Sequence, residues 1–354
     1  MKKTLSYTTC ALLLTGIANT TNATPVATYA NNITTNNISA LQHTIVNTAF
    51  NNLHRNKTTN TTTIKNNNSQ DIYGRAPMYG TMSQYGEYND DGRSGGDKSN
   101  AALNNIQFTW QHNADHVKFN EFAPLDTDYD LILVNLIGNE YNIGTVKNTW
   151  GIYTGYIGAT QENNQINIDE QGGYFGLANN FNIQKLNIKT TINAGALDNS
   201  VDTTNGTDDY TNFWIGTATR ISYDIKLDPS LILRPEIYAG YTWIKSDDYT
   251  SASGQFINNS NINSFEITPA INITKHVGNN WYWTLNTKYI IITNNDKNII
   301  VNNTKLKELD IGNFFEYGLT INKQFDNTDF SINIGRHDGD RYGWFGGLNV
   351  RYIF

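Results

Sequence analysis

The chain has 354 residues and a formal net charge of −7, with 38% hydrophobic and only 16% charged residues. This is not the highly charged composition of disordered proteins, and the acidic balance argues against nucleic acid as a partner. Abundant Asn, Thr and Tyr indicate β structure with much wet surface and not a packed α/β enzyme.

Residues 1–23 have the features of a secretory signal peptide. Two lysines precede a short apolar run, and small residues follow it. We expect cleavage after Ala23, with Ala18 as the alternative. The only cysteine, Cys10, leaves with this segment, so the exported protein is predicted to contain no disulfide and no cysteine metal site.

A helix is predicted at residues 39–55, within a short Asn/Thr-rich segment that covers residues 24–69. Ser39 is a suitable N-cap, and the apolar residues that follow fall on one helical stripe. These residues are Leu41, Ile45, Val46, Ala49, Phe50 and Leu53. A helix of this length spans about 24 Å.

The region from residue 70 to residue 140 is ambiguous. We expect a first strand at Asp71–Thr81 and a second at Tyr129–Ile137, but Leu103–Gln111 and Val117–Phe122 also have strand-like patterns. The last two segments form either a hairpin on an extended first loop or two further strands of the sheet. The first arrangement gives twelve strands and the second fourteen, and we favour twelve.

From about residue 148 to the carboxyl terminus, apolar and polar side chains alternate. A period of two places alternate side chains on opposite faces of a strand. We predict strands at residues 148–160, 166–178, 184–195, 209–225, 230–245, 262–274, 281–294, 312–323, 328–336 and 343–354.

The predicted connections alternate between short and long. The short ones are at residues 179–182, 226–229, 275–280 and 324–327, and the long ones at 195–208, 245–261 and 293–311. This layout is typical of an outer-membrane barrel, and tryptophans near strand ends are typical of its aromatic girdles. The sequence therefore predicts an all-β protein, a transmembrane antiparallel up-and-down β-barrel.

The last predicted strand stays apolar on one face to its final residue. In a barrel this strand pairs with the first, so its end cannot fray. We expect the apolar face to meet lipid and the other face to meet the lumen. The lipid-facing set is Trp344, Leu348, Val350, Tyr352 and Phe354, and the lumen-facing set is Phe345, Asn349 and Arg351.

Six segments resemble the carboxyl-terminal translocator barrel of autotransporters, the type V secretion family. They are TWGIYTGYIGAT, INIDEQGGYFGL, LILRPEIYAGYTWI, FEITPAINI, EYGLTINKQF and GGLNVRYIF, and the resemblance covers about residues 70–354. It implies twelve strands in the outer membrane of a Gram-negative-type cell, both termini in the periplasm, and a helix threaded through the pore. The predicted helix at residues 39–55 fits that place, with docking outside the pore as the alternative.

Seven charged side chains take the inward register of the predicted strands: Arg220, Arg234, Glu236, Glu266, Lys288, Glu316 and Arg351. On the lipid face, each would cost about 2–4 kcal/mol near the midplane. Charges of mixed sign inside a barrel either surround a plug helix or tune the passage of ions.

No pattern in the sequence predicts catalysis, a cofactor or a metal site. His337 stands beside Asp338 and Asp340 in a run that is ordinary turn chemistry. The acidic pairs at residues 90–91 and 208–209 lack the spacing of a calcium loop. We therefore predict that the protein is not an enzyme.

The favoured function is an autotransporter-type membrane anchor or translocator with almost no passenger, because only residues 24–38 precede the predicted helix. The alternatives are a small porin-like channel and an adhesin that acts through its outward loops. The expected partners are outer-membrane lipid and the barrel-assembly machinery, for which Tyr352 and Phe354 would form the signal. We expect a monomer that binds no nucleic acid.

Overall fold

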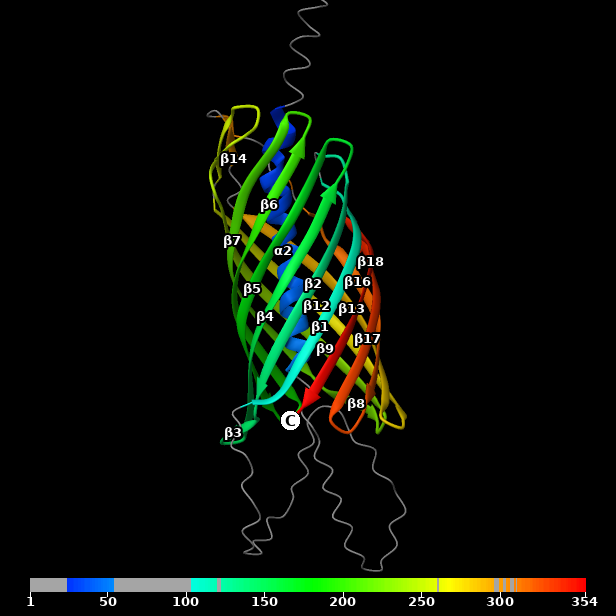
Figure 1. The fold of residues 1–354 in the computed structure, drawn as a ribbon. Helices are drawn as coiled ribbons and strands as arrows, with labels where there is room; N and C mark the ends of the chain where they lie inside the picture. The colour runs from blue at the N-terminus through cyan, green and yellow to red at the C-terminus, as the bar shows by residue number, and fades with distance from the viewer. Residues whose placement is uncertain are drawn as a thin grey trace, which may run out of the picture.

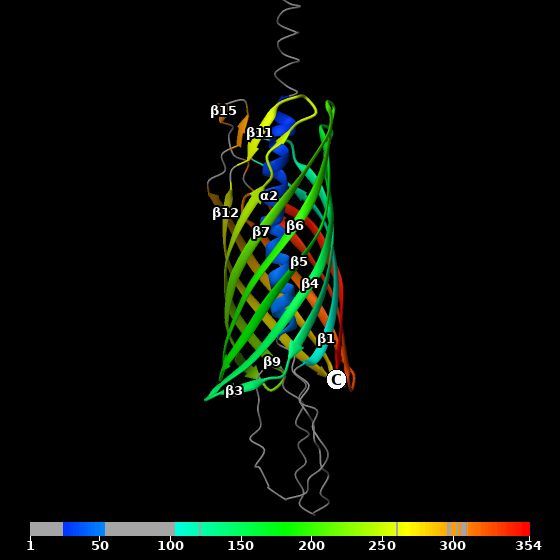
Figure 2. The ribbon, with the colours of Figure 1, turned by 60° about the vertical axis from the view of Figure 1, so that its left-hand side comes forward.

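In the computed structural model of the protein, one helix lies inside a closed antiparallel β-barrel (Figures 1 and 2). The structure describes residues 24–53, 103–119, 122–259, 261–295, 299–301, 304–305, 309 and 311–354. None of the helical residues in these ranges, which all belong to α2 (Thr24–Asn52), forms a segment long and apolar enough to cross a membrane.

The barrel has twelve strands, as predicted, and each pairs with its neighbours in chain order. Antiparallel pairing of β18 with β1 closes it. The strands are β1 (Leu103–Val117), β2 (Leu125–Gly138), β4 (Val146–Glu162), β5 (Ile166–Ile183), β6 (Leu186–Thr203), β7 (Gly206–Tyr223), β9 (Leu231–Ser246), β12 (Ile262–Gly278), β13 (Trp281–Asn295), β16 (Phe314–Gln324), β17 (Thr328–Gly339) and β18 (Arg341–Ile353).

Among the described residues, six short strands supplement the barrel. β3 (Tyr141–Ile143) pairs with β4, and β8 (Ile225–Asp228) pairs with β9. A separate four-stranded sheet contains β10 (Tyr249–Thr250), β11 (Phe256–Asn259), β14 (Ile299–Val301) and β15 (Thr304–Lys305). This small sheet lies within the predicted long loops at residues 245–261 and 293–311, near the start of α2 (Figure 2).

The first strand differs from the prediction. Asp71–Thr81 lies outside the described residues, and the strand that closes the barrel is β1, in which Phe108 pairs with Val350 on β18 and with Val134 on β2. The segment at residues 103–111 is thus the first barrel strand and not part of a loop hairpin. The second strand was placed correctly, because Tyr129–Ile137 lies within β2.

The predicted long loop at residues 195–208 is also wrong, because β6 and β7 stay paired as far as Thr203 and Gly206. The outward side chains here are polar, which resembles a loop. The inward residues Leu197 and Val201 are fully buried, however, so the inner face of the strand continues.

An apolar belt surrounds the outside of the barrel. Outward aromatic and aliphatic side chains are exposed on successive strands, including Phe175 on β5 at 64% and Trp344 on β18 at 57%. The neighbouring inward residue Phe345 is only 7% exposed. An apolar band of this kind is the surface that a barrel presents to hydrocarbon.

Helix α2 begins earlier than predicted, at Thr24 and not at Ser39. Ser39 is not a cap but a mid-helix residue whose Oγ donates to the Thr35 carbonyl at 3.1 Å. Asn and Thr are weak helix formers, so the contacts inside the barrel, and not propensity, stabilise this first half of the helix.

The helix runs through the barrel from one mouth to the other. Near its start, Asn31 bonds to Ser246 at the end of β9. At its end, Asn52 accepts a hydrogen bond from Gln107 near the start of β1. The start of α2 therefore lies at the mouth opposite to the carboxyl-terminal end of β18 (Figure 1).

Candidate functional site: the occupied lumen

One side of α2 packs against an apolar part of the barrel wall. Ile38, Leu41, Ile45 and Phe50 are almost completely buried in one cluster with Tyr129, Leu131, Leu133, Tyr153 and Ile157 from β2 and β4. The same cluster includes Tyr174 on β5, Leu197 on β6 and Trp214 on β7, so the apolar residues of the helix are buried among side chains from several neighbouring strands. The shape of the wall here is set partly by Gly176, whose missing side chain makes room for the Tyr153 ring.

The first half of α2 is held by polar contacts. Thr34 Oγ1 lies 3.1 Å from the Tyr210 hydroxyl on β7, and Asn294 on β13 donates to Asn36 at 2.6 Å. Asn37 donates a hydrogen bond to the carboxyl of Glu170 on β5, which also accepts one from Gln161 at 3.0 Å. These contacts join the helix to three separate strands of the wall.

Glu170 lies in the part of β5 that projects beyond the apolar belt. Its neighbour Asp169 is exposed on the outer face, whereas Phe175 is the first large apolar side chain of the belt on this strand. Burial raises the pKa of Glu170 to about 8, and the hydrogen bonds from Asn37 and Gln161 oppose that rise only in part. The carboxyl is therefore mostly neutral at pH 7.

The middle of α2 is joined to a chain of buried ionisable groups. His43 Nδ1 donates to the Glu266 carboxylate on β12, and His43 Nε2 lies 3.7 Å from Glu316 Oε2 on β16. Glu316 also pairs with Lys288 on β13 at 2.5 Å and lies 3.6 Å from His337 Nε2 on β17. Carboxylates buried in this way require partners, and the helix supplies one of them.

The same chain of groups continues to the seam of the barrel. His337 Nδ1 lies 2.9 Å from the carboxylate of Asp115 on β1, which also accepts from Arg341 on β18 at 2.7 Å. Asp115 and Arg341 thus join the first and last strands. Sequence analysis missed both residues, although the odd-numbered inward register of β18 would have identified Arg341.

The last turn of α2 is held by two cations. Lys189 on β6 donates to the Phe50 carbonyl at 2.6 Å, and Arg220 on β7 donates to Asn51 Oδ1 at 3.0 Å. Carbonyls at a helix end lack partners within the helix, and cations are favoured there. The Arg220 guanidinium also lies 5.1 Å from the centre of the Phe50 ring.

The remaining charged residues of the predicted set contact barrel strands. Glu236 lies 3.7 Å from Arg220, and Arg234 makes a two-point contact with Asp224, of which the Nη2 bond is 3.1 Å. Arg351 is fully buried and paired with Asp329 on β17. Three of the seven therefore contact α2 themselves, namely Arg220, Glu266 and Glu316. Lys288 and Glu236 pair with members of this set.

A polar cavity of about 120 Å³ remains beside α2. Its wall comes from the helix and from β1, β13, β16, β17 and β18, and it includes His43, Asn47, Lys288 and Glu316. A space of this size has room for a few waters. Side chains of α2 and of the wall therefore enclose a small wet volume on this side of the helix.

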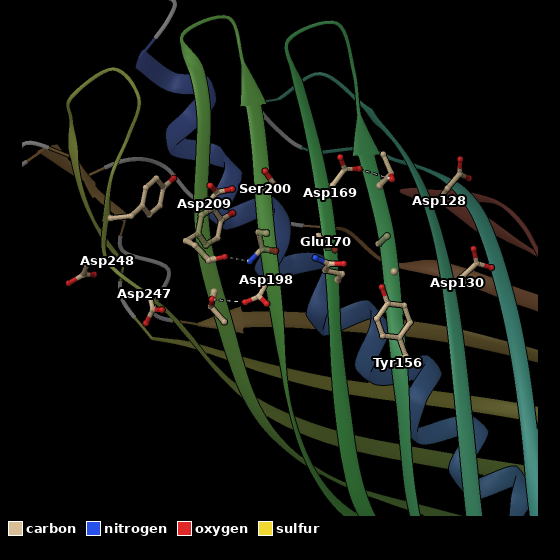
Figure 3. Close-up of a pocket in the computed structure, with 18 residues that line it drawn as sticks. Asp128, Asp130, Tyr156, Asp169, Glu170, Asp198, Ser200, Asp209, Asp247 and Asp248 are labelled. Atoms are coloured by element: carbon tan, nitrogen blue, oxygen red, sulfur yellow. Dashed lines mark hydrogen bonds between the residues drawn. The ribbon is translucent and has the colours of Figure 1, made fainter.

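The outer face of the projecting strands is acidic. Figure 3 shows exposed aspartates on β2, β5, β6 and β7 and on the segment that follows β9. They surround a hollow of about 930 Å³ and comprise Asp128, Asp130, Asp169, Asp198, Asp209, Asp247 and Asp248. Within the described ranges, no group of three or more His, Asp or Glu side chains is arranged to hold a metal ion.

The comparisons with known proteins agree with the architecture of the barrel. Residues 127–335 match the family profile described as the autotransporter beta-domain. Among curated protein sequences, none matches this chain significantly.

Three solved structures have a similar fold. The transport unit of the autotransporter AIDA-I from Escherichia coli has a TM-score of 0.57 at 14% identity, covering 73% of this chain and 92% of that one. The beta domain of the Bordetella autotransporter BrkA has a TM-score of 0.56 at 12% identity, covering 72% and 100%. The translocator domain of the autotransporter NalP from Neisseria meningitidis has a TM-score of 0.56 at 14% identity, covering 73% and 90%.

Proposed function

The chain belongs to the autotransporter beta-domain family and is an outer-membrane translocator barrel, and from this premise we propose that it keeps α2 in its lumen as a permanent plug and acts as a closed membrane anchor. The observation that carries this proposal is the set of contacts between α2 and the wall, from Asn31 near its start to Asn52 at its end. The porin-like alternative is weaker, because an open channel requires a free lumen.

The proposed orientation places the end that carries the short turns and Phe354 in the periplasm. Short turns face the periplasm in bacterial barrels, and β1 begins where β18 ends. The start of α2 and the acidic projecting strands would then face the outside of the cell. A signal peptide would direct export and be removed after Ala23, with Ala18 as the alternative.

Assembly is proposed to need the barrel-assembly machinery, with Tyr352 and Phe354 as the recognition signal on β18. Both side chains are exposed on the outer face, at 48% and 66%. They add little to the packing of the folded barrel, which favours a role in recognition. We propose that the barrel works as a monomer in outer-membrane lipid.

A non-enzymatic role is part of the same proposal. His337 is the one histidine in the predicted acidic turn. Its side chain is buried on the inner face of the barrel, where it contacts Asp115 and Glu316. That environment satisfies the imidazole with buried carboxylates of the barrel, which supports a structural role. We propose that the chain uses neither a cofactor nor a metal ion.

The experiment that tests the plug is planar-bilayer recording of the purified barrel. The intact protein should be nearly silent, and a variant that lacks residues 24–53 should conduct steadily. His112→Ala is a matched control, because this exposed side chain lies on the outer face of β1. Steady conductance of the intact protein, equal to that of the deletion variant, would overturn the proposal in favour of a porin-like channel.

A further inference from the structure

An apolar groove lies on the outside of β12, β13 and β16, close to the end of the barrel that carries Phe354. Side chains alternate along β13, so Trp281 is 45% exposed on the outer face while Tyr282 is 5% exposed. The groove has a volume of about 310 Å³. Its lining includes Val277, Trp281, Trp283, Leu285, Leu319 and Ile321.

A cation stands at the rim of this groove. Lys323 on β16 pairs in register with Trp281, and its Nζ lies 5.0 Å from the centre of the Trp281 ring. The same ammonium donates to the Asn279 carbonyl at 2.6 Å. An ammonium has three donors, and no carboxylate among the described residues pairs with this one, so its charge is available to an anion.

A second lysine on the outer face is already neutralised. Lys275 on β12 pairs in register with Trp283, on the other side of β13. Its Nζ donates to Ser230 Oγ at 2.7 Å and lies 3.6 Å from the Asp228 carboxylate. The two lysines are therefore matched in position but differ in the charge that they offer.

We propose that this groove binds an anionic phospholipid, with one acyl chain along Trp281 and Trp283 and the phosphate at Lys323. Lipid chains are as apolar as the groove, so burial alone cannot select one lipid over another. Selection comes from charge complementarity at Lys323, and aromatic rings are favoured at that depth of the bilayer. The proposal rests on the membrane placement given above, under which the groove faces the periplasmic leaflet.

Native mass spectrometry of the chain without residues 1–23 tests this assignment. The protein is equilibrated in a neutral detergent with equal amounts of phosphatidylglycerol and phosphatidylcholine that carry identical chains. One lysine near a membrane surface contributes enough for about a fivefold preference for the anionic lipid. We expect that preference in the single-lipid adduct.

Variants separate the groove from general lipid binding. Lys323→Gln should reduce the preference to about one, whereas Lys275→Gln should leave it unchanged. Trp281→Ala should lower the amount of the adduct. Folding of each variant is checked by its heat-dependent mobility on gels.

Equal binding of the two lipids by the intact protein would overturn the proposal. An unchanged preference in Lys323→Gln, or the same loss in both lysine variants, would do so as well. The conductance of each variant is recorded separately. If the plug proposal is wrong, the intact protein conducts in these recordings. If the lipid proposal is wrong, only the lipid adducts differ from the expected pattern.

Discussion

The imidazole of His43 donates a hydrogen bond to the carboxylate of Glu266 and so joins α2 to β12 across the lumen. The two residues are 223 positions apart in the sequence, and both are almost fully buried. A buried ionisable pair holds its elements together mainly because separating it leaves an unsatisfied group. The position of the helix thus depends on partners from distant strands.

Replacing His43 by alanine should loosen the plug. Glu266 would lose a buried partner, at a cost of about 1–3 kcal/mol. We expect openings in single-channel recordings to become about tenfold more frequent. His112→Ala alters an exposed histidine on the outer face. This variant should show as few channel openings as the parent protein. A His43→Ala barrel as silent as the parent would show that this contact does not hold the helix.

Glu170 should make the stability of the projecting part of the barrel depend on pH. Its folded-state pKa of about 8 lies above the ordinary value of 4.5, so the folded state binds the proton more tightly than the unfolded state. This contribution to stability is fully present below pH 4.5 and is lost as the pH rises toward 8. The loss amounts to about 5 kcal/mol at most.

Samples are heated at about pH 5, pH 7 and pH 9 and then run on gels. The quantity measured is the temperature at which the band of the folded barrel disappears. The parent should unfold at a lower temperature as the pH rises, and Glu170→Gln should show a smaller change because its side chain does not titrate. If both proteins lose the same amount of stability over this range, Glu170 is not the group responsible.

A side chain at Gly176 should destabilise the wall of the lumen. A Cβ at this position would lie 2.3 Å from the Tyr153 ring, which must then move. Overpacking of this kind costs about 1–3 kcal/mol, so Gly176→Ala should lower the thermal midpoint. Gly158→Ala is the matched control, because the nearest atom to its Cβ lies 3.5 Å away, at ordinary contact distance. Equal midpoints for the two variants would contradict the close approach of Tyr153.

Substitution of Phe354 should affect assembly more than stability. Its side chain is 66% exposed, and its backbone N–H donates to the Asn104 carbonyl at 3.0 Å, a bond that any residue can make. Phe354→Ser should therefore refold in detergent with an unchanged thermal midpoint. In cells, the amount of folded barrel in the outer membrane should fall several-fold. If the thermal midpoint of the refolded variant also falls, Phe354 has a structural role in the folded barrel.

The sequence by itself determined the two faces of the barrel strands. A period of two can be read without knowing any partner, because it follows from backbone geometry. Most strands from residue 146 onward, and the inward register of residues such as Glu266 and Arg351, follow from it. The family resemblance added the twelve-strand closure and the helix in the pore.

The tertiary structure alone decided the first strand, the length of the projecting strands and the start of α2. The outward face of β6 turns polar beyond the apolar belt, and that change resembles a loop until Leu197 and Val201 are found buried inside. The Asn- and Thr-rich start of α2 has weak local preferences, and it becomes helical where the wall satisfies its polar groups. Which residue pairs with which depends on closure of the whole sheet. Segments hundreds of residues apart meet only when β18 joins β1 around the helix.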